Sequence, residues 1–124
     1  MDIKKILIAD DEINIRLLVR SMLGKDYTVI GASHGEEAIN IARSQKPALI
    51  LMDILMPKLD GYAACHAIKM EQATQAIPVV MLTAVGYELN KKPAKEVGAD
   101  GYITKPFSPQ GLLNTIGQFL ESPK

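Results

Sequence analysis

The apolar run at residues 49–52, Leu-Ile-Leu-Met, constrains this chain most because it ends abruptly at one carboxylate, Asp53. A short continuous apolar run is typical of a strand that is buried on both faces of a parallel sheet. Ligands and catalytic groups collect beyond the carboxyl ends of such strands. Asp53 therefore either carries chemistry or merely starts a turn, and the polar residues at the ends of the other strands decide between these interpretations.

The alternation of short apolar strands with amphipathic helices predicts one doubly wound α/β domain over residues 1–124. We expect a parallel five-stranded sheet in the order 2-1-3-4-5, built from right-handed crossovers, with helices on both faces. Strands are expected at residues 6–9, 27–32, 49–52, 79–82 and 102–103. Helices are expected at residues 10–24, 35–45 and 62–72, from about residue 90, and from residue 108 onward.

Three helices carry more specific predictions. Proline is accepted only in the first turn of a helix, so Pro93 predicts that the fourth helix starts late, with Asn90 as its N-cap. Ser108 followed by Pro109 is a good N-cap and first-turn pair for the last helix. The apolar spacing in the first helix predicts a buried face made of Ile15, Leu18, Val19 and Met22.

The composition excludes some classes of partner. The formal net charge is zero and apolar residues make up 48% of the chain, so we expect no direct binding to nucleic acid or membrane. The one cysteine, Cys65, excludes an internal disulfide, and no segment resembles a signal peptide, which together predict a cytoplasmic protein. We interpret Cys65 as a small core residue, and His34 and His66 as solvated surface residues.

Chemically active side chains stand at the ends of four predicted strands. Asp10 and Asp11 follow the first strand, Asp53 the third, Thr83 the fourth and Lys105 the fifth. In the expected order, the first and third strands are neighbours, so their three carboxylates share one crevice. Clustered acids repel one another unless a cation joins them. Mg²⁺ is the favoured ion because it takes one or two carboxylates together with waters and phosphate oxygens.

These residues jointly favour phosphoryl chemistry, although each has a plainer interpretation. Taken singly, Thr83 ends a strand, Lys105 is a surface charge, and adjacent acids favour a helix N-terminus. Taken together, Asp53 can ligate the metal and attack a phosphoryl group to give an acyl phosphate. Lys105, the hydroxyl of Thr83 and the backbone N–H of Ala84 can then hold the phosphoryl oxygens.

The chain resembles the receiver domain of two-component response regulators, in particular single-domain chemotaxis regulators. The matching stretches are residues 6–12, 51–61, 81–84 and 98–107. The resemblance implies a flavodoxin-like fold in which Asp53 accepts a phosphoryl group from a phosphohistidine of a histidine kinase or a histidine phosphotransfer protein. It also implies that Asp11, Asp53 and the backbone carbonyl of Leu55 bind Mg²⁺ directly, and that Asp10 helps through water.

The resemblance further implies a switch. Thr83 and the aromatic side chain of Tyr102 move on phosphorylation and change the surface formed by the fourth helix, the fifth strand and the fifth helix. A cis peptide bond between Lys105 and Pro106 aims the lysine into the crevice. The domain is then a regulatory phosphoacceptor and not an enzyme. It is a monomer or a dimer promoted by phosphorylation. It passes its signal to an effector protein that the sequence does not identify.

Two alternatives stay open. A metal-dependent aspartyl phosphatase usually has a second acid two residues after its nucleophile, where this chain has Leu55. A receiver-like interaction module that is never phosphorylated typically lacks an acid or the lysine, and all are present here. The resemblance implies that Leu55 and Val85 flank the phosphoryl site and control how readily water reaches it, and because neither apolar side chain can orient a water they predict slow self-dephosphorylation. The last predicted helix runs almost to residue 124, so we expect no output domain, whether the chain is a stand-alone regulator, a relay intermediate or a fragment.

Overall fold

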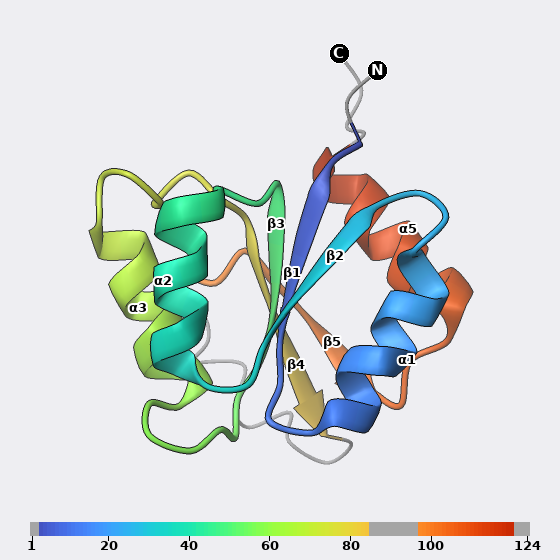
Figure 1. Cartoon of the computed structure of the whole chain (residues 1–124), viewed down its shortest axis with the longest axis horizontal. Coiled ribbons are helices and arrows are strands. Elements are labelled where there is room, and N and C mark those ends of the chain that lie inside the picture. Colours follow the sequence, from blue (N-terminus) through green and yellow to red (C-terminus); the bar gives the residue numbers. More distant parts are fainter. Residues whose placement is uncertain (1–2, 85–96, 121–124) are drawn as a thin grey trace.

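Five parallel strands form the centre of the fold in the computed structural model, which describes residues 3–84 and 97–120 (Figure 1). The strands are β1 (Lys5–Ala9), β2 (Thr28–Ala32), β3 (Leu49–Asp53), β4 (Val79–Ala84) and β5 (Gly101–Lys105). The helices in the described residues are α1 (Ile13–Leu23), α2 (Gly35–Gln45), α3 (Gly61–Met70) and α5 (Pro109–Leu120). The predictions for Asn90 and Pro93 in a fourth helix lie outside the described residues, as does Val85.

The strand order is β2-β1-β3-β4-β5, so the predicted flavodoxin-like arrangement is confirmed. The register places the carboxyl ends of the inner strands level with one another. Ala9 of β1 pairs with Met52 of β3, and Asp53 pairs with Leu82 of β4. Asp10, the residue after Ala9, therefore lies level with Asp53 at the same edge of the sheet.

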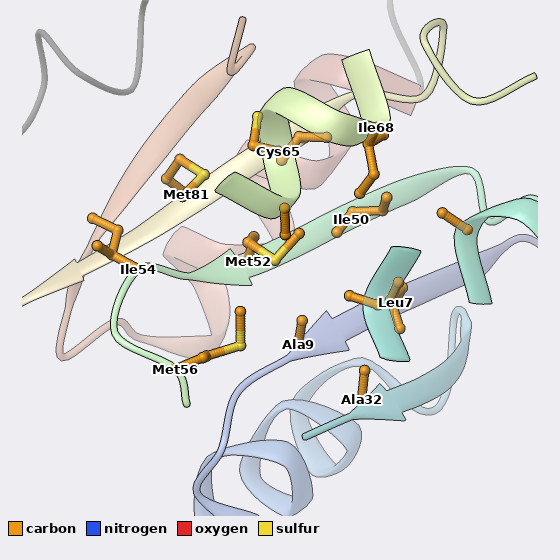
Figure 2. Close-up of a cluster of buried hydrophobic side chains, with 14 residues drawn as sticks. Leu7, Ala9, Ala32, Ile50, Met52, Ile54, Met56, Cys65, Ile68 and Met81 are labelled. Atoms are coloured by element: carbon orange, nitrogen blue, oxygen red, sulfur yellow. The ribbon is translucent and has the colours of Figure 1, made fainter. Parts of the chain in front are cut away.

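Each face of the sheet has its own hydrophobic core. On one face, alternate residues of β1, β3 and β4 pack against α2 and α3, as Figure 2 shows for Leu7, Ile50, Met52, Met81 and Cys65. On the other face, the intervening residues pack against α1 and α5. Because β3 is covered on both sides, every residue from Leu49 to Asp53 is buried. The continuous apolar run therefore reflects burial on two faces.

The first helix differs from its prediction in two respects. Leu18 is 43% exposed, whereas Leu23 is completely buried, so the predicted buried face is wrong at Leu18. Leu23 lies four residues after Val19 and therefore packs on the same side of the helix. The helix also begins at Ile13 and not at residue 10, because the backbone N–H of Glu12 donates to the carboxylate of Asp10 in the preceding loop.

The amino edge of the sheet is held by two lysines. Lys69 of α3 donates to the carbonyl of Ile77 at 2.7 Å and pairs with Asp100 at 2.7 Å. These bonds join α3 to the segments that lead into β4 and β5. Lys4, just before β1, donates to the carbonyl of Leu120 at 3.3 Å. The first and last described segments of the chain therefore meet at this edge.

The loop that follows Asp53 folds back tightly onto β3. The N–H of Gly61 donates to the carbonyl of Ile54 at 2.8 Å. A Cβ atom at Gly61 would lie only 2.1 Å from the carbonyl oxygen of Asp53, so only glycine permits this approach. Asp60 caps the start of α3 by accepting from the N–H of Ala63 at 2.8 Å. The loop conformation is thus tied to the end of the strand that carries Asp53.

This close approach predicts that Gly61→Ala destabilises the protein. The new methyl group would meet backbone atoms, which cannot move aside as a side chain can, so we expect a loss of about 2–4 kcal/mol in the free energy of unfolding. Urea denaturation followed by circular dichroism measures it. Gly111→Ala is the matched control, because its methyl would meet only the hydroxyl of Ser108, at 3.1 Å. Equal stabilities of the two variants would contradict the prediction.

Candidate acidic site

Asp10 is completely buried and its polar atoms are paired. Its N–H donates to the carbonyl of Ala32 at 3.0 Å, which extends the pairing of β1 with β2 by one bond. Its carboxylate accepts from the N–H of Glu12 at 2.9 Å and from Nζ of Lys105 at 3.0 Å. The next residue, Asp11, is exposed. The Asp10 carboxylate is thus held by hydrogen bonds, whereas Asp11 faces solvent.

Lys105 joins two of the acids across the end of the sheet. Its Nζ lies 2.9 Å from Oδ1 of Asp53 and 3.0 Å from Oδ2 of Asp10. Lys105 is the last residue of β5, and the peptide bond between it and Pro106 is cis. The structure therefore brings together three of the residues that the sequence singled out at different strand ends.

The remaining candidate residues surround this group at the carboxyl edge of the sheet. Thr83 is 6% exposed and pairs with Thr104, and the backbone of Ala84 pairs with Lys105. Leu55, in the loop after Asp53, is 64% exposed. Tyr102 is 43% exposed on β5. Thr83 thus lies in the strand next to Asp53, whereas Tyr102 faces solvent three residues before Lys105.

The surroundings of Asp53 raise the pKa of its carboxyl group. Burial raises the pKa of Asp53 from 3.8 to about 6, and the nearby charges of Asp10 and Asp11 add to this shift, while the hydrogen bond from Lys105 opposes it. For Lys105, burial lowers the pKa, but the hydrogen bonds to Asp53 and Asp10 outweigh burial and raise it overall. The site therefore holds more negative charge than its lysine neutralises.

A hard divalent cation fits this group of side chains. One carboxylate oxygen from each of Asp10, Asp11 and Asp53 can be chosen so that all lie within 4.8 Å of one another. All of these donors are oxygens, which suit Mg²⁺ better than Zn²⁺. Three ionised carboxylates and one ammonium leave a net charge of −2. An ion of charge +2 would balance this excess.

Two contacts at this edge were not predicted from the sequence. His34 was expected to be solvated, but its Nδ1 accepts from the N–H of Glu37 at 3.2 Å and caps α2, so that prediction is wrong. Its position directly before Gly35, where the helix starts, was the available signal. The second contact is made by Arg16 of α1, whose Nη1 donates to the backbone carbonyl of Asp10 at 2.7 Å. The sequence gives only a weak signal for it, an arginine one turn into the helix that follows the acids.

This fold and this acidic edge define a class of regulatory domain, and comparison with known proteins identifies it. The chain belongs to the response regulator receiver domain family, which matches residues 6–117. A probable transcriptional regulator, ycf27, of Cyanophora paradoxa is 46% identical over 120 residues, covering 94% of this chain and 48% of the relative. The chain spans about half the length of the curated relatives it matches.

Solved structures agree with this assignment. The chemotaxis protein CheY4 of Vibrio cholerae is 34% identical and superposes with a TM-score of 0.90, covering 96% of this chain and 100% of that one. The receiver domain of the sensor histidine kinase PA1611 of Pseudomonas aeruginosa is 28% identical with a TM-score of 0.89, covering 96% and 98%. That structure contains a magnesium ion coordinated in its active site cleft. The present chain is therefore a receiver domain of a two-component system.

The raised pKa of Asp53 predicts a pH-dependent effect of Asp53→Asn in protein freed of divalent cations with EDTA. The native carboxyl group binds its proton more tightly than the unfolded one, so its contribution to stability is complete below pH 3.8 and is lost as pH rises through about 6. Asparagine keeps the shape but not the charge. We expect the variant to be more stable than the parent by roughly 1–3 kcal/mol above pH 6.5, with a much smaller difference at pH 4.

Thermal unfolding across this pH range measures the difference. Asp26→Asn, which alters an exposed residue in the turn after α1, is the control and should show no such pH dependence. A difference between Asp53→Asn and the parent that is the same at every pH would contradict the assignment.

Proposed function

We propose that Asp53 is the phosphoacceptor of this receiver domain, in a Mg²⁺-dependent reaction with a phosphohistidine of a histidine kinase or histidine phosphotransfer protein. The observation that carries the proposal is the convergence of Asp10, Asp53 and Lys105 from three separate strands, with Asp11 beside them. This exchange takes place in the cytoplasm, where the ATP that histidine kinases use is found. The downstream partner is an effector protein.

The residues at the carboxyl edge have distinct parts in this reaction. An oxygen of Asp53 forms the new bond to phosphorus while the bond from phosphorus to the histidine nitrogen breaks, and that nitrogen keeps the electron pair. Asp11, Asp53 and the backbone carbonyl of Leu55 would hold Mg²⁺ directly and Asp10 through water, and the bound ion would neutralise charge on the phosphoryl oxygens. Lys105 supplies a second positive charge. The hydroxyl of Thr83 and the N–H of Ala84 donate to the phosphoryl group.

The signal leaves the site through Thr83 and Tyr102. Thr83 is buried beside Asp53, whereas Tyr102 is 43% exposed in the neighbouring strand. A phosphoryl group shifts an equilibrium only by binding one state better than the other. A hydrogen bond from the Thr83 hydroxyl supplies that difference, and Tyr102 carries it to the surface of β5 and α5, which the sequence predicts a fourth helix to complete. The monomer or a phosphorylation-promoted dimer then meets the effector.

The geometry favours this function over the two alternatives. A phosphatase needs an acid that can protonate its leaving group, and the exposed apolar side chain of Leu55 stands at the position where such an acid is usual. In a module that is never phosphorylated, a lysine paired with two buried acids would have no role in binding a phosphoryl group. Asp10, Asp53 and Lys105 also form a costly arrangement of charge, which favours a role beyond stability.

Incubation with acetyl phosphate and Mg²⁺ tests the proposal. We expect intact-protein mass spectrometry to show one phosphoryl adduct that forms only with the divalent ion. Asp53→Ala should remove the adduct, and Asp26→Asn, the exposed control, should keep it. Continuous consumption of acetyl phosphate without an adduct would indicate a phosphatase. Labelling of Asp53→Ala to the level of the parent would exclude Asp53 as the acceptor.

The exposed side chain of Leu55 predicts a long-lived phosphoryl group. It has no polar atom to orient an attacking water, so Leu55→Asn should shorten the lifetime of the adduct, by about tenfold. Decay of the isolated phosphoprotein, followed by mass spectrometry after removal of the donor, measures this lifetime. Leu55→Met keeps the apolar character and should decay like the parent. An unchanged lifetime in Leu55→Asn would count against a role of this position.

A further inference from the structure

One backbone oxygen of the acidic site is held by a side chain that is not itself one of the site residues. The carbonyl of Asp10 accepts from Nη1 of Arg16 at 2.7 Å. This bond is shorter than the bonds at 2.9 and 3.0 Å that the carboxylate of the same residue accepts. Its donor is a charged guanidinium, and charge-assisted hydrogen bonds are stronger than neutral ones. Arg16 thus holds the backbone at the first acid.

The bond acts on the peptide unit that connects Asp10 to Asp11. Because a peptide unit is planar, fixing its oxygen fixes the orientation of the N–H and Cα that lead into Asp11. The carboxylate of Asp10 has partners of its own in Glu12 and Lys105. Across residues 3–84 and 97–120, no hydrogen bond or ion pair holds the carboxylate of Asp11. The backbone therefore sets where the Asp11 side chain leaves the chain, which limits the positions that its carboxylate can reach.

The fold provides space for Arg16 at one glycine of the neighbouring strand. Gly31 of β2 pairs with Ile8 of β1. A Cβ atom at Gly31 would lie 3.2 Å from Cδ and 3.6 Å from Nε of Arg16. The arginine side chain therefore crosses β2 where no side chain covers the strand, and a larger residue at this position would press against it.

Arg16 also lies near the loop that follows β2. The pKa of Glu37 in α2 is lowered, mainly by the hydrogen bond from the backbone of Ser33, with a smaller contribution from the charge of Arg16. The Glu37 carboxylate accepts from the N–H of Ser33 at 2.7 Å. The guanidinium thus bonds to the loop that follows β1 and lies near enough to α2 for its charge to act on Glu37, and a half-buried side chain in such a place has few alternative positions.

From these contacts we propose that Arg16 is a positioning residue for Mg²⁺ binding. It holds the peptide between Asp10 and Asp11 in the orientation that brings the Asp11 carboxylate to the other two acids. This role rests on the proposed function of the acidic site. Groups that orient metal ligands typically change metal affinity by about 10–100-fold when they are removed.

A positioning role and a purely electrostatic effect of Arg16 predict opposite changes in Mg²⁺ affinity when the residue is replaced. Arg16 is a cation close to a cation site, so removal of its charge alone would strengthen Mg²⁺ binding. Loss of its hydrogen bond frees the peptide and weakens binding. Arg20 provides a matched control, because it lies one turn later on α1, is exposed, and donates to the carbonyl of Val29 at 3.3 Å, away from the acids. Arg16→Met and Arg20→Met therefore lose the same charge from the same helix.

The experiment is a Mg²⁺ titration of the full chain followed by amide NMR shifts at constant ionic strength. We expect Arg16→Met to raise the dissociation constant about tenfold, Arg16→Lys about threefold, and Arg20→Met by less than about twofold. Labelling of Arg16→Met with acetyl phosphate should need more Mg²⁺ for half its maximal rate, and should reach the parent's rate at saturation. Binding by Arg16→Met that equals or exceeds that of Arg20→Met would overturn the proposal.

Gly31→Ala decides the matter if Arg16→Met does not fold. Its methyl group would press on the arginine stem, 3.2 Å from Cδ, without any change of charge, and we expect about threefold weaker Mg²⁺ binding. Unchanged affinity in that variant would also overturn the proposal. The behaviour of the parent protein distinguishes failure of the proposed function from failure of the role of Arg16. If the parent neither binds Mg²⁺ nor accepts phosphate, the proposed function fails, whereas a normal parent with an unaffected Arg16→Met refutes only the role of Arg16.

Discussion

The ammonium group of Lys105 allows acidic residues to gather at the carboxyl edge of the sheet. Asp10 is completely buried and Asp53 nearly so, and a buried carboxylate is costly unless it has a partner. Lys105 supplies that partner to both, from positions 95 and 52 residues away in the sequence. Because β4 lies between β3 and β5, only a long side chain can cross the end of β4 to reach Asp53. The neutralisation is incomplete, and the excess negative charge leaves a place for a divalent ion.

The loop between β3 and α3 is the second element that gives the site its form. It closes through Gly61 against the backbone of Asp53, and it contains Lys58 with φ at +69°, a conformation that favours glycine. The start of α2 also touches this loop, because a Cβ at Gly35 would lie 2.3 Å from the carbonyl of Leu59. The loop is thus fixed from two directions. The elements on one face of the sheet hold the segment that follows Asp53.

The sequence predicted the strand order and the gathering of acids because both depend on simple regularities. The apolar run before Asp53 reflects burial on two faces, and parallel strands place their polar ends on one edge. The exposure of Leu18 escaped prediction because apolar spacing marks a stripe on α1 but does not say which residues of that stripe the sheet covers, and the adjacent Leu17 is exposed as well. The contacts of His34 and Arg16 escaped for another reason. Both contacts are to backbone groups: His34 accepts from an N–H in the first turn of α2, and Arg16 donates to a loop carbonyl whose position does not follow from residue type.

The contact between Lys4 and Leu120 affects how this domain connects to anything else. The ends of the described chain meet at the amino edge of the sheet, whereas the carboxylates lie at the carboxyl edge. A polypeptide joined near either end would therefore start at the edge of the sheet opposite the three carboxylates. A linker that leaves from this edge could vary in length without touching the acids or Lys105.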